Sequence, residues 1–249
     1  MIVYPNAKIN LGLNVLRKRE DGYHDISSVF YPVKECVDIL EIVKSEKFEF
    51  TKSGIEIPDG ENLCEKAWRL LDADFGIGNV KIHLHKQIAI GAGLGGGSAD
   101  ASFTLKVLDD LFDLNLSDTE LEKYALKLGA DCPFFIENKP KLVEGMGEKM
   151  TFVDLDLSEY NIRLINPGIH VSTKEAYNGV VPKIPALDVE KIIELPIIEW
   201  KGKLKNDFEG SVFIKYPKLI DFKDKLYKEG AIYASMSGSG SIVFGVFKK

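Results

Sequence analysis

The first segment of the chain alternates apolar and polar residues in the way that a β-strand does. The apolar positions are Ile9, Leu11, Leu13 and Val15, and the positions between them are Lys8, Asn10, Gly12 and Asn14. A period of two residues places these two sets on opposite faces of a strand. We therefore predict a strand over residues 7–15 with one apolar and one polar face.

The same kinds of pattern predict the other elements of the chain. Alternation predicts strands over 80–88 and 159–168, two strands within 230–247, and a hairpin over 47–58 that turns at Ser53-Gly54. Helical spacing of apolar residues predicts helices over 61–75, 98–112 and 117–128, the last with a capping box from Ser117 to Glu120 and a stop at Gly129. Because strands and helices alternate irregularly, we expect an α+β (mixed α/β) fold. A shift in composition near residues 150–160 predicts two domains, 1–152 and 153–249.

Composition and charge narrow the class of protein. The chain has 249 residues and a net charge of −6, with acidic and basic residues mixed along it. No basic tract offers the clustered positive field that a nucleic acid or an anionic membrane needs, so we expect neither as a partner. The three cysteines show no metal-ligand spacing, and the first residues do not resemble a signal peptide, so we expect a soluble, cytoplasmic protein.

A glycine-rich segment, "IAIGAGLGGGSADAS" at residues 88–102, carries the strongest chemical signal. It satisfies GxGxxG, but the helix after it is followed by another helix, so the βαβ unit of a dinucleotide site is missing. It also nearly satisfies the Walker pattern, except that Gly97 stands where the phosphate-binding lysine is required. What remains is a nest of backbone N–H groups before a helix N-terminus, which suits a polyphosphate. Ser98 is expected at the helix start, where it could cap the helix and face a phosphate.

Two polar clusters accompany this loop. Lys8 and Asn10 share the polar side of the first strand, and Asp21-Gly22-Tyr23-His24 follows at a predicted turn. A solvated lysine, a turn aromatic and a surface histidine are the ordinary alternatives. In the second cluster, Asp131 stands directly before Cys-Pro-Phe-Phe, and a carboxylate beside such an apolar run needs a partner. An N-cap for a short following helix is the alternative for Asp131.

Taken together and in this order, these segments resemble the motifs of the GHMP kinase family (galactose, homoserine, mevalonate and phosphomevalonate kinases). The resembling segments are 7–15 with 21–24, the loop 91–102, 128–135 and the glycine-rich 235–241, with shorter matches at 61–63 and 206–209. The resemblance implies a small-molecule kinase with an N-terminal domain like one in a small-subunit ribosomal protein. It also implies a C-terminal ferredoxin-like domain and an active site between the two.

The resemblance further implies roles for individual residues. Asp131 would take the proton from the acceptor hydroxyl, and Lys8 would stand close to both. ATP, with Mg²⁺, would lie with its adenine near Asn62. The implied ATP-binding residues of the loop are Ala89, Ile90, Gly91, Ala92, Gly93, Leu94, Gly95, Gly96, Gly97, Ser98 and Ala99. Because phosphoryl transfer depends mainly on positioning and on charge stabilisation, a nest, a lysine and a carboxylate cover its needs.

Within the family, residues 7–15 together with 21–24 resemble members whose substrate is methylerythritol linked to cytidine diphosphate. That resemblance implies that Asn10, Tyr23, His24, Thr173 and Tyr177 bind the substrate, with the cytosine between aromatic rings. The alternatives are a GHMP kinase for a mevalonate-type or homoserine-type alcohol, and an inactive nucleotide-binding module.

The sequence departs from the family pattern at three places. Ala89 or Ile90 replaces the proline that usually opens the loop, and Ala99 replaces a second serine. The chain also stops at Lys249, directly after the last predicted strand, so the C-terminal domain is expected to be shorter than in relatives.

Overall fold

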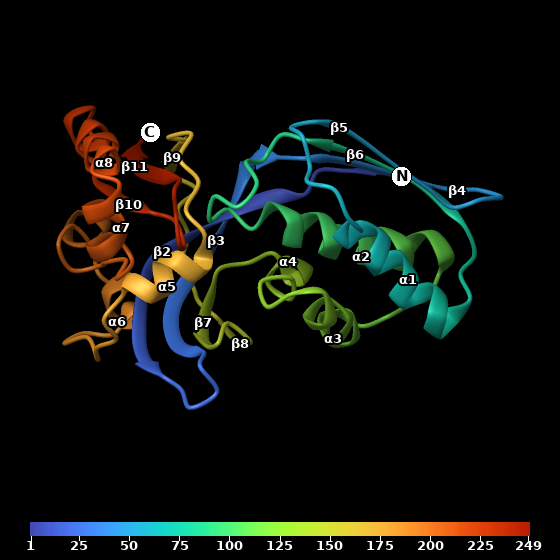
Figure 1. The fold of residues 1–249 in the computed structure, drawn as a ribbon, viewed down its shortest axis with the longest axis horizontal. Helices are drawn as coiled ribbons and strands as arrows, with labels where there is room; N and C mark the ends of the chain where they lie inside the picture. Colours follow the sequence, from blue (N-terminus) through green and yellow to red (C-terminus); the bar gives the residue numbers. More distant parts are fainter. The chain divides into compact units, whose positions relative to one another are not determined.

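The structure, a computed structural model, describes all of residues 1–249 and divides into two compact units. The first unit comprises 1–7, 32–90 and 95–139, and the second comprises 8–31, 91–94 and 140–249. The glycine loop and two long strands thus contribute residues to both units. The mixed α/β class is confirmed (Figure 1).

The first unit is built on a four-stranded sheet with the order β1-β4-β6-β5. Its strands are β1 (Ile2–Val3), β4 (Ile39–Lys44), β5 (Glu49–Gly54) and β6 (Val80–Lys86). The helices of this unit are α1 (Leu63–Phe75), α2 (Gly96–Phe112), α3 (Asp118–Leu128) and α4 (Phe134–Glu137). As Figure 1 shows, α1 and α2 lie along one face of the sheet. Apolar residues of β4 and β6, such as Leu40 and Ile82, form one core with these helices.

The helix boundaries in this unit follow from local sequence signals. Asn62 begins α1 with a capping box to Glu65, and Gly76 ends it in the left-handed conformation. The predicted capping box from Ser117 to Glu120 is present at the start of α3, and Gly129 stands at its end as predicted.

The predicted hairpin over 47–58 is wrong. Residues 49–54 form a single strand, β5, which pairs in parallel with β6. Gly54 has a positive φ, and the carbonyl oxygen of Lys86 lies too close to it to admit a Cβ. The next residue, Ile55, donates its N–H to that same carbonyl, after which the chain leaves the sheet. The apolar residues beyond Gly54 therefore serve a loop rather than a second arm.

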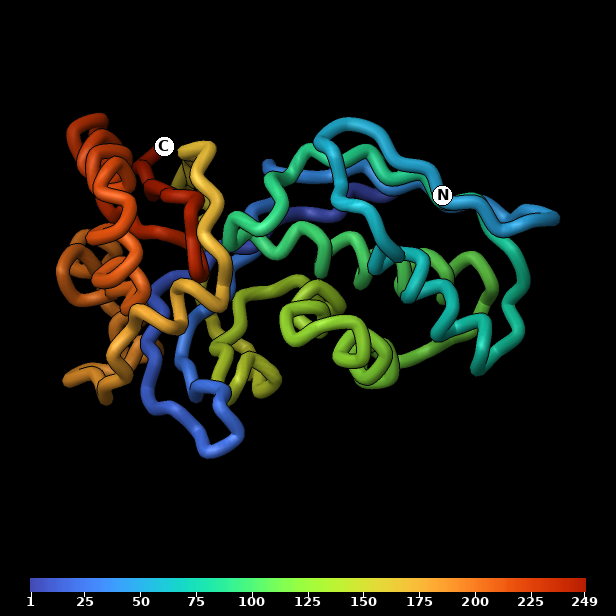
Figure 2. Tube along the Cα trace, viewed as in Figure 1, coloured from blue at the N-terminus to red at the C-terminus, as the bar shows by residue number.

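The remaining two sheets lie mainly in the second unit. One has the order β2-β3-β7-β8, formed by β2 (Asn6–Lys18), β3 (His24–Val37), β7 (Lys141–Gly145) and β8 (Lys149–Phe152). The other has the order β10-β11-β9, formed by β9 (Tyr160–Ile165), β10 (Tyr233–Met236) and β11 (Val243–Lys248). Figure 2 shows the chain doubling back at residues 19–23 between β2 and β3, where the turn was predicted.

The second unit also contains five helical elements. They are α5 (Thr173–Gly179), α6 (Val189–Ile193), the 3₁₀ turn η1 (Ile197–Glu199), α7 (Glu209–Lys215) and α8 (Lys218–Lys228). α8 packs against β10 and β11 (Figure 1). Asn206 lies buried before α7 and donates to the carbonyl oxygens of Met236 and Gly238, each at 2.8 Å. It therefore fixes the start of the glycine turn 237–242.

None of the helices combines the length and the apolar character that crossing a bilayer requires.

Candidate active site

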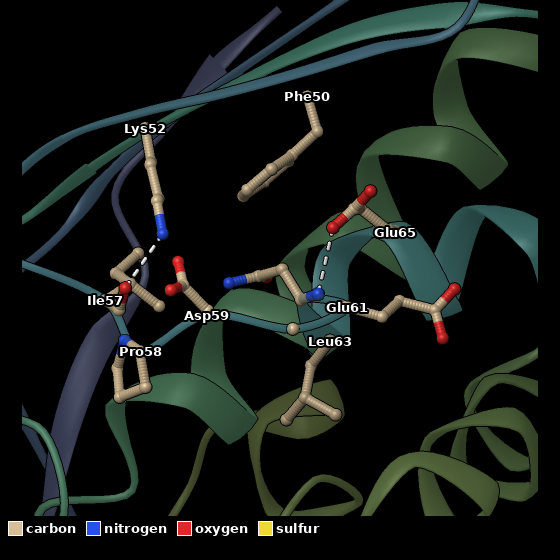
Figure 3. Close-up of a pocket in the computed structure, with 10 residues that line it drawn as sticks. Phe50, Lys52, Ile57, Pro58, Asp59, Glu61, Leu63 and Glu65 are labelled. Carbon is tan, nitrogen blue, oxygen red and sulfur yellow. Dashed lines mark hydrogen bonds between the residues drawn. The ribbon is translucent and has the colours of Figure 1, made fainter.

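A pocket of about 420 Å³ opens in the first unit beside the start of α1. Phe50 and Lys52 of β5 form one wall, and the loop 57–61 forms the other (Figure 3). Asn62, which was predicted to lie near the adenine of ATP, also lines this pocket. Its side chain is committed to the helix cap, because it accepts the N–H of Cys64 at 2.9 Å. The Lys52 ammonium donates to the carbonyl of Ile57, which ties the loop to the sheet across the pocket.

Backbone conformation explains why three positions of the glycine loop are occupied by glycine. Gly91, Gly93 and Gly95 all have φ between 63° and 82°, a region that other L-residues rarely adopt. Gly95 is the N-cap of α2, and no side chain caps this helix. The prediction that Ser98 caps the helix is therefore wrong, because the helix begins at Gly96, two residues before the predicted start. Ala89 and Ile90, at the start of the loop, are half-buried and 40% exposed, respectively.

The turn that carries Asp131 is fastened directly to the first turns of α2. The Ser102 hydroxyl, on α2, lies 2.7 Å from the carbonyl oxygen of Cys132 and 2.9 Å from that of Ser98. The Cys132 thiol contacts the Ser98 side chain, and burial raises its pKa to about 11. Asp131 itself is half-buried and precedes α4, whose N-cap is Pro133, so it is not the cap of that helix. Ser98 and the turn that carries Asp131 are thus brought together within the first unit.

The polar face of β2 is buried rather than solvated. Lys8 is 4% exposed, and its ammonium donates to Asn10 Oδ1 at 2.6 Å and lies over the Phe30 ring. Asn10 Nδ2 donates to the hydroxyl of Ser28, which in turn donates to the carbonyl of Gly12. This chain of hydrogen bonds holds the ammonium in one place and orients the amide of Asn10.

The same strand holds the front of the glycine loop. The Lys8 N–H donates to the Leu94 carbonyl at 2.9 Å. The Ser237 hydroxyl donates to the Gly93 carbonyl at 2.8 Å and accepts the N–H of Asn10. Within the second unit, three of the sequence motifs therefore meet: the first strand, residues 91–94 of the loop, and the glycine turn after β10.

The aromatic residues predicted to bind the substrate are partly brought together. His24 stacks on Tyr177, with ring centroids 4.9 Å apart, and Tyr177 meets Phe208 edge-on. Burial lowers the pKa of His24, with a further contribution from Lys18. Tyr23 is 64% exposed, and its backbone N–H donates a hydrogen bond to the Asp21 carboxylate in the turn. Thr173 begins α5, and its hydroxyl lies 3.3 Å from that of Ser239.

Lys8 and Asp131 belong to different units, so their proximity stays a prediction. No group of three or more His, Cys, Asp or Glu side chains is arranged to hold a metal ion.

Comparison with known proteins decides the family. Residues 62–139 match the model of the GHMP kinases N-terminal domain, and residues 194–249 match that of the GHMP kinases C-terminal domain. Similarity also extends over the whole chain: a 4-diphosphocytidyl-2-C-methyl-D-erythritol kinase of Azobacteroides pseudotrichonymphae is 52% identical across 100% of this chain and 94% of its own. The chain belongs to the GHMP kinase family. It is accordingly a small-molecule kinase, as the sequence motifs predicted.

Further comparisons agree with this assignment. The kinase of the same name from Bacteroides fragilis (strain ATCC 25285) is 51% identical across 99% of this chain and 92% of its own. A crystal structure of 4-(cytidine 5'-diphospho)-2C-methyl-D-erythritol kinase superposes with a TM-score of 0.85 and 35% identity, covering 99% of this chain and 90% of the other. Homoserine kinase from Cytophaga hutchinsonii shares only 16% identity at a TM-score of 0.72, over 98% and 85% of the two chains, and supports the fold alone.

Three buried charged residues near the loop were not among the predicted site residues: Asp38, Lys86 and Asp100. A signal for Lys86 was present, because it continues the apolar register of Val80, Ile82 and Leu84 along β6. A lysine at a position of core register must find a buried partner.

Proposed function

We propose that this kinase transfers the γ-phosphoryl group of ATP to the 2-hydroxyl of 4-diphosphocytidyl-2-C-methyl-D-erythritol, a step of the non-mevalonate route to isoprenoid precursors. One observation carries the proposal: relatives bearing that name are about half identical to this chain over its full length. The motifs at 7–15 and 21–24, which resemble those of that enzyme in particular, also support it. The proposal places the reaction in the cytoplasm, without a nucleic acid or membrane partner, and keeps the two domains at 1–152 and 153–249.

The proposed catalytic pair is Asp131 and Lys8. As the substrate oxygen attacks the γ-phosphorus, the Asp131 carboxylate accepts its proton, which a weakly acidic alcohol needs. The Lys8 ammonium lends positive charge to the reacting oxygen and the transferred phosphoryl group. Two features support these roles: the Lys8 ammonium is buried in a fixed orientation by Asn10, and the Asp131 turn is fastened to the helix that follows the glycine loop.

ATP is proposed to lie with its phosphates on the backbone N–H groups of residues 89–99 and its adenine beside Asn62. The positive N-terminal end of α2, seventeen residues long, favours an anion there. The pocket beside Asn62 has a volume suited to part of a small ligand.

Mg²⁺ is proposed to accompany ATP. In kinase sites this ion uses one or two protein oxygens and takes the rest of its ligands from phosphates and water. The Ser98 hydroxyl and the Asp131 carboxylate are oxygen donors of that type, and both are half-buried in the same part of the first unit. When bound, the ion would neutralise charge on the phosphates.

Recognition of the cytidine end is proposed to rest on Tyr23, His24 and Tyr177, with Asn10 and Thr173 contacting other parts of the substrate. The rings of His24 and Tyr177 already lie in contact in the second unit, and the largely exposed ring of Tyr23 offers a further stacking surface. Stacking of a base on an aromatic side chain contributes about 1–3 kcal/mol.

The proposal is tested by an assay coupled to ADP release. Purified protein with ATP and Mg²⁺ is supplied with a panel of alcohols with and without a cytidine diphosphate group, including mevalonate and homoserine. Turnover only of the cytidine-linked methylerythritol supports the proposal, whereas preferred turnover of an alcohol without cytidine contradicts it. Asp131→Asn and Lys8→Ala should each nearly abolish turnover while the protein remains folded. Full activity in both variants would show that the catalytic roles lie elsewhere.

A further inference from the structure

Three charged side chains are buried together at the end of β6. The Lys86 ammonium donates to Asp38 Oδ2 at 2.5 Å and to Asp100 Oδ2 at 2.6 Å. None of the three side chains is more than 3% exposed. Removing charges from water is costly, and apolar residues of similar volume are often at least as stabilising as a buried ion pair. Stability alone therefore gives a weak reason for this cluster.

The cluster joins the two ends of the glycine loop. Asp38 Oδ1 accepts the N–H groups of Gln87 and Ile88, where the chain leaves β6 for the loop. Asp100 lies in the second turn of α2, where the chain has left the loop. Lys86 connects the two carboxylates and so connects the two ends. Gly96, the first residue of α2, packs closely against the side chains of Lys86 and Ile88. A Cβ at this position would lie 3.0 Å from the Lys86 ammonium and 2.8 Å from Ile88 Cγ2.

We propose that Asp38, Lys86 and Asp100 are positioning residues for ATP, forming a buried ionic clasp that fixes the two ends of the glycine loop relative to each other. The proposal rests on the proposed function in one respect, namely that the loop holds the phosphates of ATP. A segment with this many glycines has a permissive backbone, so its geometry depends strongly on where its ends are held. Asp38 holds the backbone at Ile88, the residue at which the glycine-rich segment begins.

Asp100 is the residue whose part in the clasp can be removed most cleanly. Its Oδ2 binds Lys86, while its Oδ1 is buried without a hydrogen-bond partner. Shortening this side chain therefore orphans no partner of Oδ1 and leaves Lys86 still paired with Asp38. Alanine is also a good helix former. Asp100→Ala should thus fold, with the start of the loop still held and its end released.

The test measures the KM for ATP, the KM for the alcohol substrate and kcat in Asp100→Ala and Asp100→Asn. A misplacement of about 1 Å at a positioning element can cost about 100-fold in rate. We expect Asp100→Ala to raise the KM for ATP by about 10- to 100-fold, with the KM for the alcohol within about twofold of the wild type. Asp100→Asn keeps an oxygen acceptor for Lys86 and should restore the KM for ATP to within about threefold.

Two matched controls come from the same elements. Lys81→Met removes an exposed lysine of β6 that pairs with Glu49, and Asp110→Ala removes an exposed aspartate of α2. Both should leave the KM for ATP unchanged. A triple variant, Asp38→Asn/Lys86→Met/Asp100→Leu, replaces the charges by groups of similar size and keeps an amide oxygen for the N–H groups of Gln87 and Ile88. It should unfold at a temperature near that of the wild type but still show the raised KM for ATP.

The outcomes separate the clasp from the proposed function. If the wild type turns over ATP, and folded Asp100→Ala and the folded triple variant keep its KM for ATP within twofold, the clasp serves stability only and the inference is overturned. The inference is equally overturned if the KM values for ATP and for the alcohol rise together. If the wild type itself shows no turnover with the proposed substrate, the proposed function fails instead. The clasp is then judged by the dissociation constant of ATP alone, which should still rise in Asp100→Ala.

Discussion

Gly93 offers a sharp test of how the glycine loop is held. Its φ of 82° lies in the left-handed region, and its carbonyl accepts the Ser237 hydroxyl. A Cβ at this position would lie 2.9 Å from the carbonyl carbon of Ser237, and closer still to the carbonyl oxygen. Because these are backbone atoms, no side-chain rotation can relieve the contact. We therefore expect Gly93→Ala to push the loop and the turn at Ser237 apart.

The size of the effect follows from these contacts. Relieving the contact with the carbonyl carbon alone, from 2.9 Å to about 3.5 Å, requires a shift of about 0.6 Å, and the nearer carbonyl oxygen requires a shift of about 1 Å. The left-handed conformation adds about 1–2 kcal/mol for a residue with a Cβ. Shifts of about 1 Å in positioning elements cost about 100-fold in rate. Gly93→Ala should accordingly lower kcat/KM for ATP by about 10- to 100-fold and reduce the free energy of unfolding by about 1–2 kcal/mol.

The assay is steady-state ADP release with varied ATP, together with thermal unfolding of each variant. Gly210→Ala serves as the control, because this glycine lies in α7 without a positive φ, and no atom beyond its chain neighbours and its own helix backbone lies within 4 Å of the position that its methyl group would take. It should be as active as the wild type and slightly more stable. A kcat/KM for Gly93→Ala within threefold of the wild type would refute the reasoning, because the contact with Ser237 would then yield without consequence for the loop.

Three further predictions concern other parts of the molecule. Asn206→Ala removes two hydrogen bonds to Met236 and Gly238 and one from Phe208, and unfolding in urea should show a loss of about 3–5 kcal/mol. Tyr177→Ala should raise the KM for the cytidine-linked substrate about 10- to 100-fold and leave that for ATP unchanged, because the ring stacks on His24. Burial raises the pKa of Asp100 to about 7. The Lys86 ammonium acts in the opposite direction and lowers this pKa, whereas the Asp38 carboxylate raises it further. Between about pH 4 and pH 7, Asp100 therefore binds more protons in the folded protein than in the unfolded chain. As pH rises through that range, the wild type should lose stability relative to Asp100→Asn, as measured by thermal unfolding.

The elements that could be predicted are those whose signals are local. The cap at Ser117 and the strict alternation in residues 80–86 depend on neighbours within a few positions. The cap at Asn62 is equally local but was not predicted, and the helix begins at Leu63 rather than at residue 61. The segment after Gly54 failed for the opposite reason. Its alternation looked like a second strand arm, but whether it joins the sheet was decided by the carbonyl of Lys86, which is distant in the chain. Local pattern carries no information about such a contact.

The candidate site divides in the same way. The glycine loop was proposed as a phosphate site because its backbone pattern suits phosphate, and Lys8 and Asp131 were proposed as the catalytic pair because their segments resemble motifs of the family. The start of α2 was misplaced by two residues, because glycines leave no side-chain signal for a cap and the helix begins on Gly96. The hydrogen-bond chain through Ser28 and Ser237 could not be predicted, because serines are common and their partners come from distant strands.

The two buried lysines show what a sequence can still reveal about such partners. Lys8 stands in the polar register of β2, so its burial follows only once Asn10 and Phe30 are known to cover it. Lys86 stands in the apolar register of β6, so its strand alone places it in the core. A buried ammonium in that register requires carboxylates nearby. The loop that follows begins two residues later, and Asp100 is the first carboxylate beyond it. A lysine in the apolar register of a strand, followed by a glycine loop and then an aspartate, therefore predicts from sequence alone that the lysine and the aspartate pair across the base of that loop.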